Sequence, residues 1–325
     1  MIAAAWTVVE PGALGGRSRP ANGPHRAAAA AVHRYPGPMA VSATKLGELR
    51  QRFERDGFVR VPKLLDDETL DGLAATYMRF VRRDIQVPGR DFCDMAADYE
   101  RAAEEYDVVN VMLPRRYHPV WRGNPWERAA AEIARGLVPA ATALDYDQLV
   151  AKPPGKPDAV FHWHQDLAYW PETPEPETVT LWLALDDVDV DNGCLRFVPG
   201  SHREPELRPH RPLLGDRDES HTLVADVSEA RDEIICAPLA RGEALAFRER
   251  VLHGSGGNTS DRWRRAYVVA FRTAATVAAE RAMGFTHSHD DDLDVLRAVS
   301  GLEDQPDADA NRHAGGLDID RGRRV

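Results

Sequence analysis

Two short segments far apart in the chain carry side chains that could together bind a metal ion. His164 and Asp166 are two residues apart, so in an extended strand both side chains point to the same face. His253, much further along, supplies a second imidazole. Two imidazoles and one carboxylate can occupy one face of an octahedral ion and leave the opposite face open. This ligand set is the one expected of a non-heme Fe(II) oxygenase.

A histidine and an aspartate two residues apart are common by chance, but the residues after His253 strengthen the interpretation. Ser255 follows two positions later, and Arg264 begins an apolar run that contains Ala266 and Val268. If that run is a strand, Arg264 shares the face of Ala266 and Val268, and Arg265 takes the other face. A forked guanidinium at one end and open metal positions at the other suit a dicarboxylate cosubstrate. The alternative interpretation of Arg264 is a surface arginine.

Further motifs between about residues 45 and 275 extend this pattern. They are Ala151-Lys152-Pro153-Pro154, His164-Gln165-Asp166-Leu167 with Tyr169 and Pro171, Trp182, Asp191-Asn192-Gly193-Cys194-Leu195, Pro199-Gly200-Ser201-His202, and His253-Gly254-Ser255 through Asn258, Ser260 and Arg264. In this order they resemble the phytanoyl-CoA dioxygenase family of Fe(II)- and 2-oxoglutarate-dependent oxygenases. The resemblance implies a double-stranded β-helix with helices packed outside it.

The resemblance also implies the cofactors and their ligands. Fe(II) would be held by His164, Asp166 and His253, and 2-oxoglutarate and O2 would take the open positions, with ascorbate supporting activity. Arg264 would fork onto the distal carboxylate of 2-oxoglutarate, and Ser255 would add a hydrogen bond. Hydroxylation, with release of succinate and CO2, is the default reaction. Related halogenases have Ala or Gly at the carboxylate position, so Asp166 disfavours halogenation.

Two further residues match family positions that line the cosubstrate pocket. These are Trp182 and Gln148, although Trp182 could equally be a core aromatic and Gln148 could satisfy neighbouring backbone. Lys152 is expected to serve its own loop without a catalytic role, and Asn110 is a further candidate for the pocket wall.

The remaining histidines are interpreted as non-ligands. His162 shares the face of His164 and is expected beside the metal ligands or facing the substrate. His202 closes a Pro-Gly-Ser-His turn, where a structural hydrogen bond is expected. His287 and His289 lie in a polar segment rich in aspartate and are expected to be solvated.

The composition limits the classes of partner. A net charge of −11 disfavours nucleic-acid and anionic-membrane partners, which require basic patches. The three cysteines form no C-x-x-C pair, and no apolar run approaches the roughly 20 residues that span a bilayer. These features predict a cytoplasmic protein without a nucleic-acid or membrane partner, and the resemblance implies a small-molecule substrate. The oligomeric state stays open.

The chain is expected to hold one folded domain with two irregular ends. Residues 1–38 are rich in Ala, Gly, Pro and Arg, which predicts a disordered segment or an over-extended start, with Met39 the plausible initiator. Residues 39–286 would form a single dioxygenase domain. Residues 287–325 would be a flexible acidic tail.

Within the domain, helices are expected to dominate the first 140 residues. One helix would begin at Thr44 and end at Gly57, a second would be capped by Asp67, and a third would begin after Asn124 and end at Gly136. The pattern then changes to strands. These are expected at 178–186, with Val179 and Leu181 on an apolar face and Trp182 on a mixed one, and at 194–198, 242–247 and 265–272.

Asn192-Gly193 is expected to form the turn between the first two of those strands. The stretch 203–237 has no period, so it is expected to be an insertion that covers the barrel mouth. Many short strands with turn punctuation indicate a mainly β fold with flanking helices, a jelly-roll, cupin-like core.

Two functions from different classes fit these residues. The first is a 2-oxoglutarate-dependent hydroxylase of a small metabolite, with secondary metabolism as one setting. Desaturation, ring formation and oxidative loss of an amine stay open as outcomes. The second is a non-oxidative cupin-like isomerase or binding module that keeps the triad. Succinate and CO2 formed from 2-oxoglutarate would distinguish the enzyme from the binding module.

Overall fold

The computed structural model describes residues 40–141, 143–173, 177–216 and 221–285. The expectations for 1–38 and Met39, and for 287–325 with His287 and His289, lie outside the described residues. Within the described ranges, no helix is both long enough and apolar enough to cross a membrane.

The first helix, α1 (Ala43–Asp56), is capped by Ser42 and not by the predicted Thr44. The Ser42 side chain accepts a hydrogen bond from the Lys45 backbone N–H at 3.2 Å, which satisfies one of the unpaired donors at a helix start. The predicted end is confirmed, because Gly57 has φ of +83° and turns the chain into β1 (Phe58–Val61).

The caps of the next long helices also follow side-chain chemistry. α2 (Asp67–Val81) is capped by Asp66, whose carboxylate accepts from the Thr69 N–H at 2.8 Å, so the prediction of Asp67 was wrong by one residue. α4 (Pro125–Leu137) begins after the predicted cap, Asn124. Gly136 does not end it, since the backbone stays helical through Leu137.

Most strands belong to two antiparallel sheets. The large sheet has seven strands in the order β1-β11-β6-β13-β4-β3-β2, and the small sheet has four in the order β10-β7-β12-β5. The large-sheet strands are β1, β2 (Phe92–Asp94), β3 (Val109–Met112), β4 (Ala143–Lys152), β6 (Thr178–Ala184), β11 (Ala244–Arg248) and β13 (Arg264–Arg272). The small-sheet strands are β5 (Phe161–His164), β7 (Leu195–Phe197), β10 (Ile235–Ala237) and β12 (His253–Ser255).

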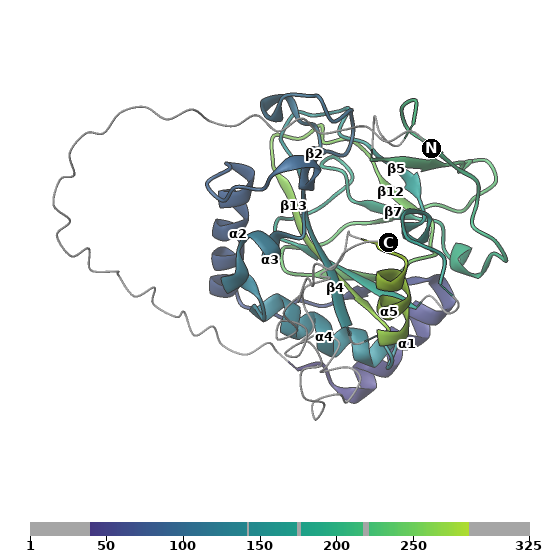
Figure 1. The fold of residues 1–325 in the computed structure, drawn as a ribbon. Helices are drawn as coiled ribbons and strands as arrows, with labels where there is room; N and C mark the ends of the chain where they lie inside the picture. The colour runs from purple at the N-terminus through teal and green to yellow at the C-terminus, as the bar shows by residue number, and fades with distance from the viewer. Residues whose placement is uncertain (1–39, 142, 174–176, 217–220, 286–325) are drawn as a thin grey trace, which may run out of the picture. The chain divides into compact units, whose positions relative to one another are not determined.

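The shorter elements complete the chain. They are β8 (His210–Pro212), β9 (Leu223–Ala225), α3 (Pro114–Tyr117), α5 (Ala274–Ala282) and the 3-10 turns η1 (Gly89–Asp91), η2 (Ala103–Glu105), η3 (Pro119–Trp121), η4 (Asp166–Tyr169) and η5 (Ser201–Arg203). Figure 1 shows α2, α3 and α4 outside the large sheet, and β5, β7 and β12 on its other side. The predicted double-stranded β-helix with flanking helices is confirmed.

The predicted two faces of β6 are confirmed. Val179 and Leu181 lie in the core between the large sheet and the helices, whereas Trp182 lies in the core between the two sheets, together with Phe197 of the small sheet. The interior between the sheets is therefore the place where strand side chains from both layers meet.

Helices dominate the first 140 residues, as expected, although β1, β2 and β3 also lie there and belong to the large sheet. Two expectations about connections need correction. Asn192-Gly193 does not join paired strands, because β6 belongs to the large sheet and β7 to the small one. The stretch 203–237 is not without strands, since it contains β8 and β9, which pair with each other, and β10, which joins the small sheet.

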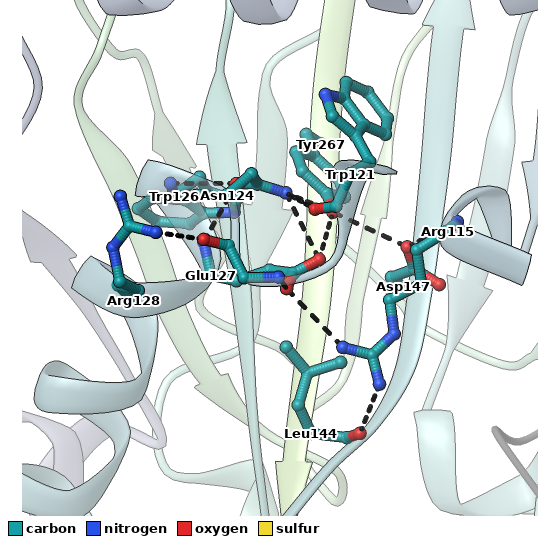
Figure 2. Close-up of polar contacts among 10 residues, drawn as sticks. Arg115, Trp121, Asn124, Trp126, Glu127, Arg128, Leu144, Asp147 and Tyr267 are labelled. Atoms are coloured by element: carbon teal, nitrogen blue, oxygen red, sulfur yellow. Dashed lines mark hydrogen bonds and ion pairs between the residues drawn. The ribbon is translucent and has the colours of Figure 1, made fainter. Parts of the chain in front are cut away.

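A buried polar network braces the large sheet from the helix side (Figure 2). Tyr267 on β13 donates to Glu127 of α4 at 3.0 Å, and the Asn124 side chain donates to the Tyr267 hydroxyl at 3.0 Å. Arg115 of α3 lies 3.5 Å from Glu127, and its backbone N–H donates to Asp147 of β4 at 3.2 Å. Burial raises the pKa of Glu127 to about 7. The network therefore ties two helices to the paired strands β4 and β13.

Candidate metal centre

The two sheet strands that carry the predicted imidazoles are hydrogen-bonded neighbours. His164 ends β5, His253 begins β12, and the two residues are register partners. Asp166 opens η4 directly after β5. Its Oδ1 lies 3.4 Å from His164 Nε2 and 3.6 Å from His253 Nε2. One donor atom from each residue lies within 4.8 Å of the others, so the three side chains predicted to hold iron converge.

Both imidazoles are oriented by backbone carbonyls. His164 Nδ1 lies 2.7 Å from the carbonyl oxygen of His162, and His253 Nδ1 lies 3.1 Å from that of Val251. A carbonyl can only accept, so Nδ1 carries a proton in each ring, which leaves Nε2 as the atom that can bind a metal. Both Nε2 atoms face the Asp166 carboxylate. A backbone partner on the other ring nitrogen is typical of metal-binding histidines.

The protonation states also fit a cation. Burial, followed by the neighbouring His164, lowers the pKa of His253 to about 4, so its imidazole is neutral at neutral pH. Burial alone would raise the pKa of Asp166, but His253, His164 and a 3.3 Å hydrogen bond from Thr180 outweigh it and hold that pKa below its ordinary value. Two imidazoles and one carboxylate are the donor set that Fe(II) accepts.

Arg264 lies inside the protein and not on its surface. It is 1% exposed, and its guanidinium is 5.0 Å from the Trp182 ring, donates to the Gly193 carbonyl at 3.2 Å and donates to Ser255 Oγ at 3.2 Å. Its Nη1 is buried and has no hydrogen-bond partner in the structure. Arg265 points the other way and pairs with Asp186, as alternation predicts. Arg264 therefore offers unsatisfied donors to the interior.

Lys152 joins this cationic end of the interior. It is the register partner of Arg264, is fully buried, and its Nζ donates to Ser255 Oγ at 2.6 Å and to the Gly256 carbonyl. Burial first, and then Arg264, lower its pKa well below the ordinary value. Among the described residues, no carboxylate forms an ion pair with either cation. Like charges opposite each other on paired strands are destabilising. The arrangement thus favours an anionic ligand.

The triad lines one pocket together with Arg264 and Ser255. The other lining side chains are mainly aromatic or apolar. They are Met95, Met112, Tyr146, Gln148, Val150, Phe161, Tyr169, Trp170, Thr180, Trp182, Leu195, His221, Phe247, Val268 and Phe285.

Comparison with known proteins decides the family. The family model described as phytanoyl-CoA dioxygenase matches residues 53–266, which contain all three residues of the triad and Arg264. The chain belongs to the phytanoyl-CoA dioxygenase family. The predicted 2-oxoglutarate-dependent dioxygenase, with iron and 2-oxoglutarate as its cofactor and cosubstrate, is confirmed.

Individual relatives give the same family and the same fold. Peroxisomal phytanoyl-CoA dioxygenase of Rattus norvegicus is 26% identical over 225 residues, which cover 67% of this chain and 66% of the relative. EvdO2 from Micromonospora carbonacea var. aurantiaca, also solved in complex with 2-oxoglutarate, is 29% identical at a TM-score of 0.59 over 70% of this chain and 90% of EvdO2. The chain spans about two thirds of the length of the curated relatives it matches first.

A third comparison shows the fold alone. The epimerase SnoN, solved with Fe3+, alpha ketoglutarate and nogalamycin RO, is 24% identical at a TM-score of 0.56 and covers 72% of this chain and 85% of SnoN.

Other residues predicted from the phytanoyl-CoA dioxygenase resemblance divide between the pocket and the scaffold. Trp182 and Gln148 both line the pocket, and Gln148 donates to Asn110. Asn110 itself is fully buried behind that amide. His202 forms the expected structural hydrogen bond, since its Nε2 lies 3.2 Å from the Glu54 carbonyl. The side chain of His162 is absent from the described lining of the pocket.

Sequence reasoning missed three contributors to this phytanoyl-CoA dioxygenase site. Thr180 binds Asp166 and stands on the mixed face of β6, so the alternation could have found it. Lys152 was interpreted as serving its loop, although its amine reaches Ser255. Phe285 lies beyond the last predicted strand and gave no signal.

Proposed function

We propose that this dioxygenase hydroxylates an unactivated C–H bond of a small-molecule metabolite, with release of succinate and CO2. His164, Asp166 and His253 would hold Fe(II), and Arg264 with Ser255 would hold the distal carboxylate of 2-oxoglutarate. When bound, iron with 2-oxoglutarate and O2 supplies the oxidising power for C–H cleavage.

The observation that carries this proposal is the buried cationic end of the pocket. Arg264 and Lys152 share the Ser255 hydroxyl, and Arg264 keeps an unpartnered Nη1 on the same pocket as the triad. A fully buried guanidinium without a carboxylate is costly unless a ligand supplies the charge. A dicarboxylate ligand could bind the metal through one carboxylate and pair with the Arg264 guanidinium through the other.

Neighbouring side chains position the candidate metal ligands and keep water away from them. Thr180 holds the Asp166 carboxylate by its 3.3 Å hydrogen bond. Phe247 packs against His253 with ring centroids 4.7 Å apart, and Phe161 packs against His164 at 4.8 Å. These rings exclude water from the imidazoles and keep each Nε2 directed into the pocket.

The test is consumption of 2-oxoglutarate by the purified chain with Fe(II), ascorbate and a set of candidate metabolites. We expect succinate in equal amount to a product heavier by one oxygen atom. A non-oxidative isomerase or binding module would form neither, and would keep ligand affinity in His253→Ala. Stoichiometric succinate with an unchanged mass of the candidate would contradict hydroxylation and leave the dioxygenase class in place.

We also propose a cytoplasmic setting. All three cysteines are free, with Cys93 and Cys194 buried and Cys236 exposed, which suits a reducing compartment. A thiol titration of the native and unfolded protein purified from the cytoplasm, giving one and three reactive groups, would support this.

A further inference from the structure

The C-terminal helix brings a pocket residue from outside the segment that matches the family. The match ends at residue 266, and α5 follows β13. The Thr273 hydroxyl caps α5 by accepting from the Thr276 N–H at 3.0 Å. Three residues after α5 ends, Phe285 lines the pocket that holds the triad. This wall therefore lies outside the residues that the family model matches.

A buried ionic cluster fastens α5 to the large sheet. Arg272, at the end of β13, pairs with Glu280 of α5 and lies 3.6 Å from Asp145 of β4. Arg281 of α5 lies 3.4 Å from the same Asp145. Arg272, Glu280 and Asp145 are each at most 2% exposed in their side chains. Two cations and two carboxylates balance, so removal of one member would leave an uncompensated buried charge.

The same cluster holds a second aromatic side chain of the pocket. The Arg272 guanidinium lies over the Trp170 ring at 3.8 Å from its centroid. Trp170 follows η4, the turn that Asp166 opens, and lines the pocket. A cation–π contact of a buried arginine is among the stronger ones of its kind. Arg272 thus links the position of Trp170 to that of α5.

The end of α5 directs Phe285 back to the protein. Gly284 has φ of +76° and donates to the Arg281 carbonyl at 3.0 Å, while the Phe285 N–H donates to the Glu280 carbonyl at 3.1 Å. This is the hydrogen-bond pattern with which a left-handed glycine ends a helix and reverses the chain. A Cβ on Gly284 would meet no atom within 4 Å, so the glycine is needed for its backbone conformation alone.

We infer that Trp170 and Phe285 form an aromatic subsite for an uncharged aromatic ring system of the substrate, positioned by the cluster of Arg272, Glu280, Asp145 and Arg281. The inference rests on the proposed function and names the substrate class of the same site. Asp166 and Arg264 are the only Asp, Glu, Lys or Arg residues in the described lining. Under the proposed function, iron would engage the first and the cosubstrate the second. The remaining lining offers ring faces and apolar surface, which suit a flat neutral ligand.

The direct test uses 2-naphthol as probe, in equilibrium dialysis against the anaerobic holoenzyme with Fe(II) and 2-oxoglutarate. We expect 2-naphthol to bind and the anion 2-naphthoate to bind at least about tenfold more weakly, because the subsite lacks a free cation. Phe285→Ala should weaken 2-naphthol binding about tenfold. The matched control is Met283→Ala, since Met283 is 53% exposed and lies two residues earlier.

A second variant separates positioning from contact. Glu280→Gln keeps both rings but breaks the pair with Arg272, so we expect weaker 2-naphthol binding with an unchanged dissociation constant for 2-oxoglutarate. Equal 2-naphthol affinity in the wild type, Phe285→Ala and Glu280→Gln, or no binding to the wild type, would overturn the subsite. If the wild-type enzyme does not bind 2-oxoglutarate, the proposed function is overturned instead. The same dialysis measures 2-oxoglutarate binding separately from 2-naphthol binding.

Discussion

Lys152 and Arg264 stand opposite each other on β4 and β13 and donate to the same oxygen, Ser255 Oγ, at 2.6 Å and 3.2 Å. A serine hydroxyl has two lone pairs and one hydrogen. Because the two cations occupy the lone pairs, the hydroxyl hydrogen is left to donate to a further acceptor. We expect that acceptor to be the distal carboxylate of 2-oxoglutarate.

Lys152→Met tests this relationship. The variant removes one donor to Ser255 and frees its hydroxyl to rotate, so 2-oxoglutarate should bind roughly ten times more weakly, as expected for loss of one charge-assisted hydrogen bond. Iron affinity should stay unchanged. Isothermal titration of both ligands gives the answer, with Lys45→Met on the exposed side of α1 as control. Unchanged 2-oxoglutarate affinity in Lys152→Met would show that Lys152 serves only its own loop and does not help to bind 2-oxoglutarate.

Arg264→Lys probes the geometry of the guanidinium, because lysine keeps the charge and loses the planar fork. The 2-oxoglutarate concentration for half-maximal succinate formation should rise about ten- to a hundredfold, far more than that of the organic substrate. Arg262→Ala is the matched control, since Arg262 forms an exposed pair with Asp189. Equal changes for both substrates would count against Arg264 as the carboxylate anchor.

Asp166→Ala should weaken Fe(II) binding by roughly a hundredfold or more, because loss of even an outer partner of a metal ligand commonly costs ten- to a hundredfold. Competition with a coloured Fe(II) chelator under anaerobic conditions measures this without turnover. His162→Ala is the control, because the contact of His162 with His164 is made through its backbone carbonyl and its side chain is absent from the described pocket lining. If Asp166→Ala has the circular dichroism spectrum of the wild type and binds Fe(II) as tightly, the Asp166 carboxylate is excluded as a ligand.

Glu249 predicts a pH dependence of stability. Burial raises its pKa to about 7, although its carboxylate accepts from the Thr178 N–H at 2.9 Å. A carboxyl whose folded pKa is raised favours the folded state below its ordinary pKa near 4.5, and that contribution is lost as pH rises through about 7.

Glu249→Gln removes this titration and keeps an oxygen for Thr178. Relative to the variant, the wild type should therefore lose up to about 3 kcal/mol of unfolding free energy between pH 5 and pH 8. Urea unfolding at both pH values measures the difference. Parallel pH profiles for the two proteins would show that Glu249 stays ionised in the fold.

The convergence of the candidate ligands could be predicted better than their surroundings, for physical reasons. Residues two apart stay close in an extended segment, although Asp166 lies in η4 and not in the strand that ends at His164. The inward face of Arg264 follows from its two neighbours Ala266 and Val268. Two of the three predicted helix starts were missed by one or two residues. Ser42 and Thr44, for example, offer similar caps, and only the chain path selects one. Phe285 was missed because its place depends on ionic contacts with β4 and β13, which no local pattern records.

The pairing of β5 with β12 has a consequence for how the protein handles iron. Because backbone hydrogen bonds set the spacing of His164 and His253, the pairing of the two strands places two of the three candidate ligands without help from the ion. Removal of the ion by a chelator should therefore be reversible, and the far-ultraviolet circular dichroism should stay the same with and without iron.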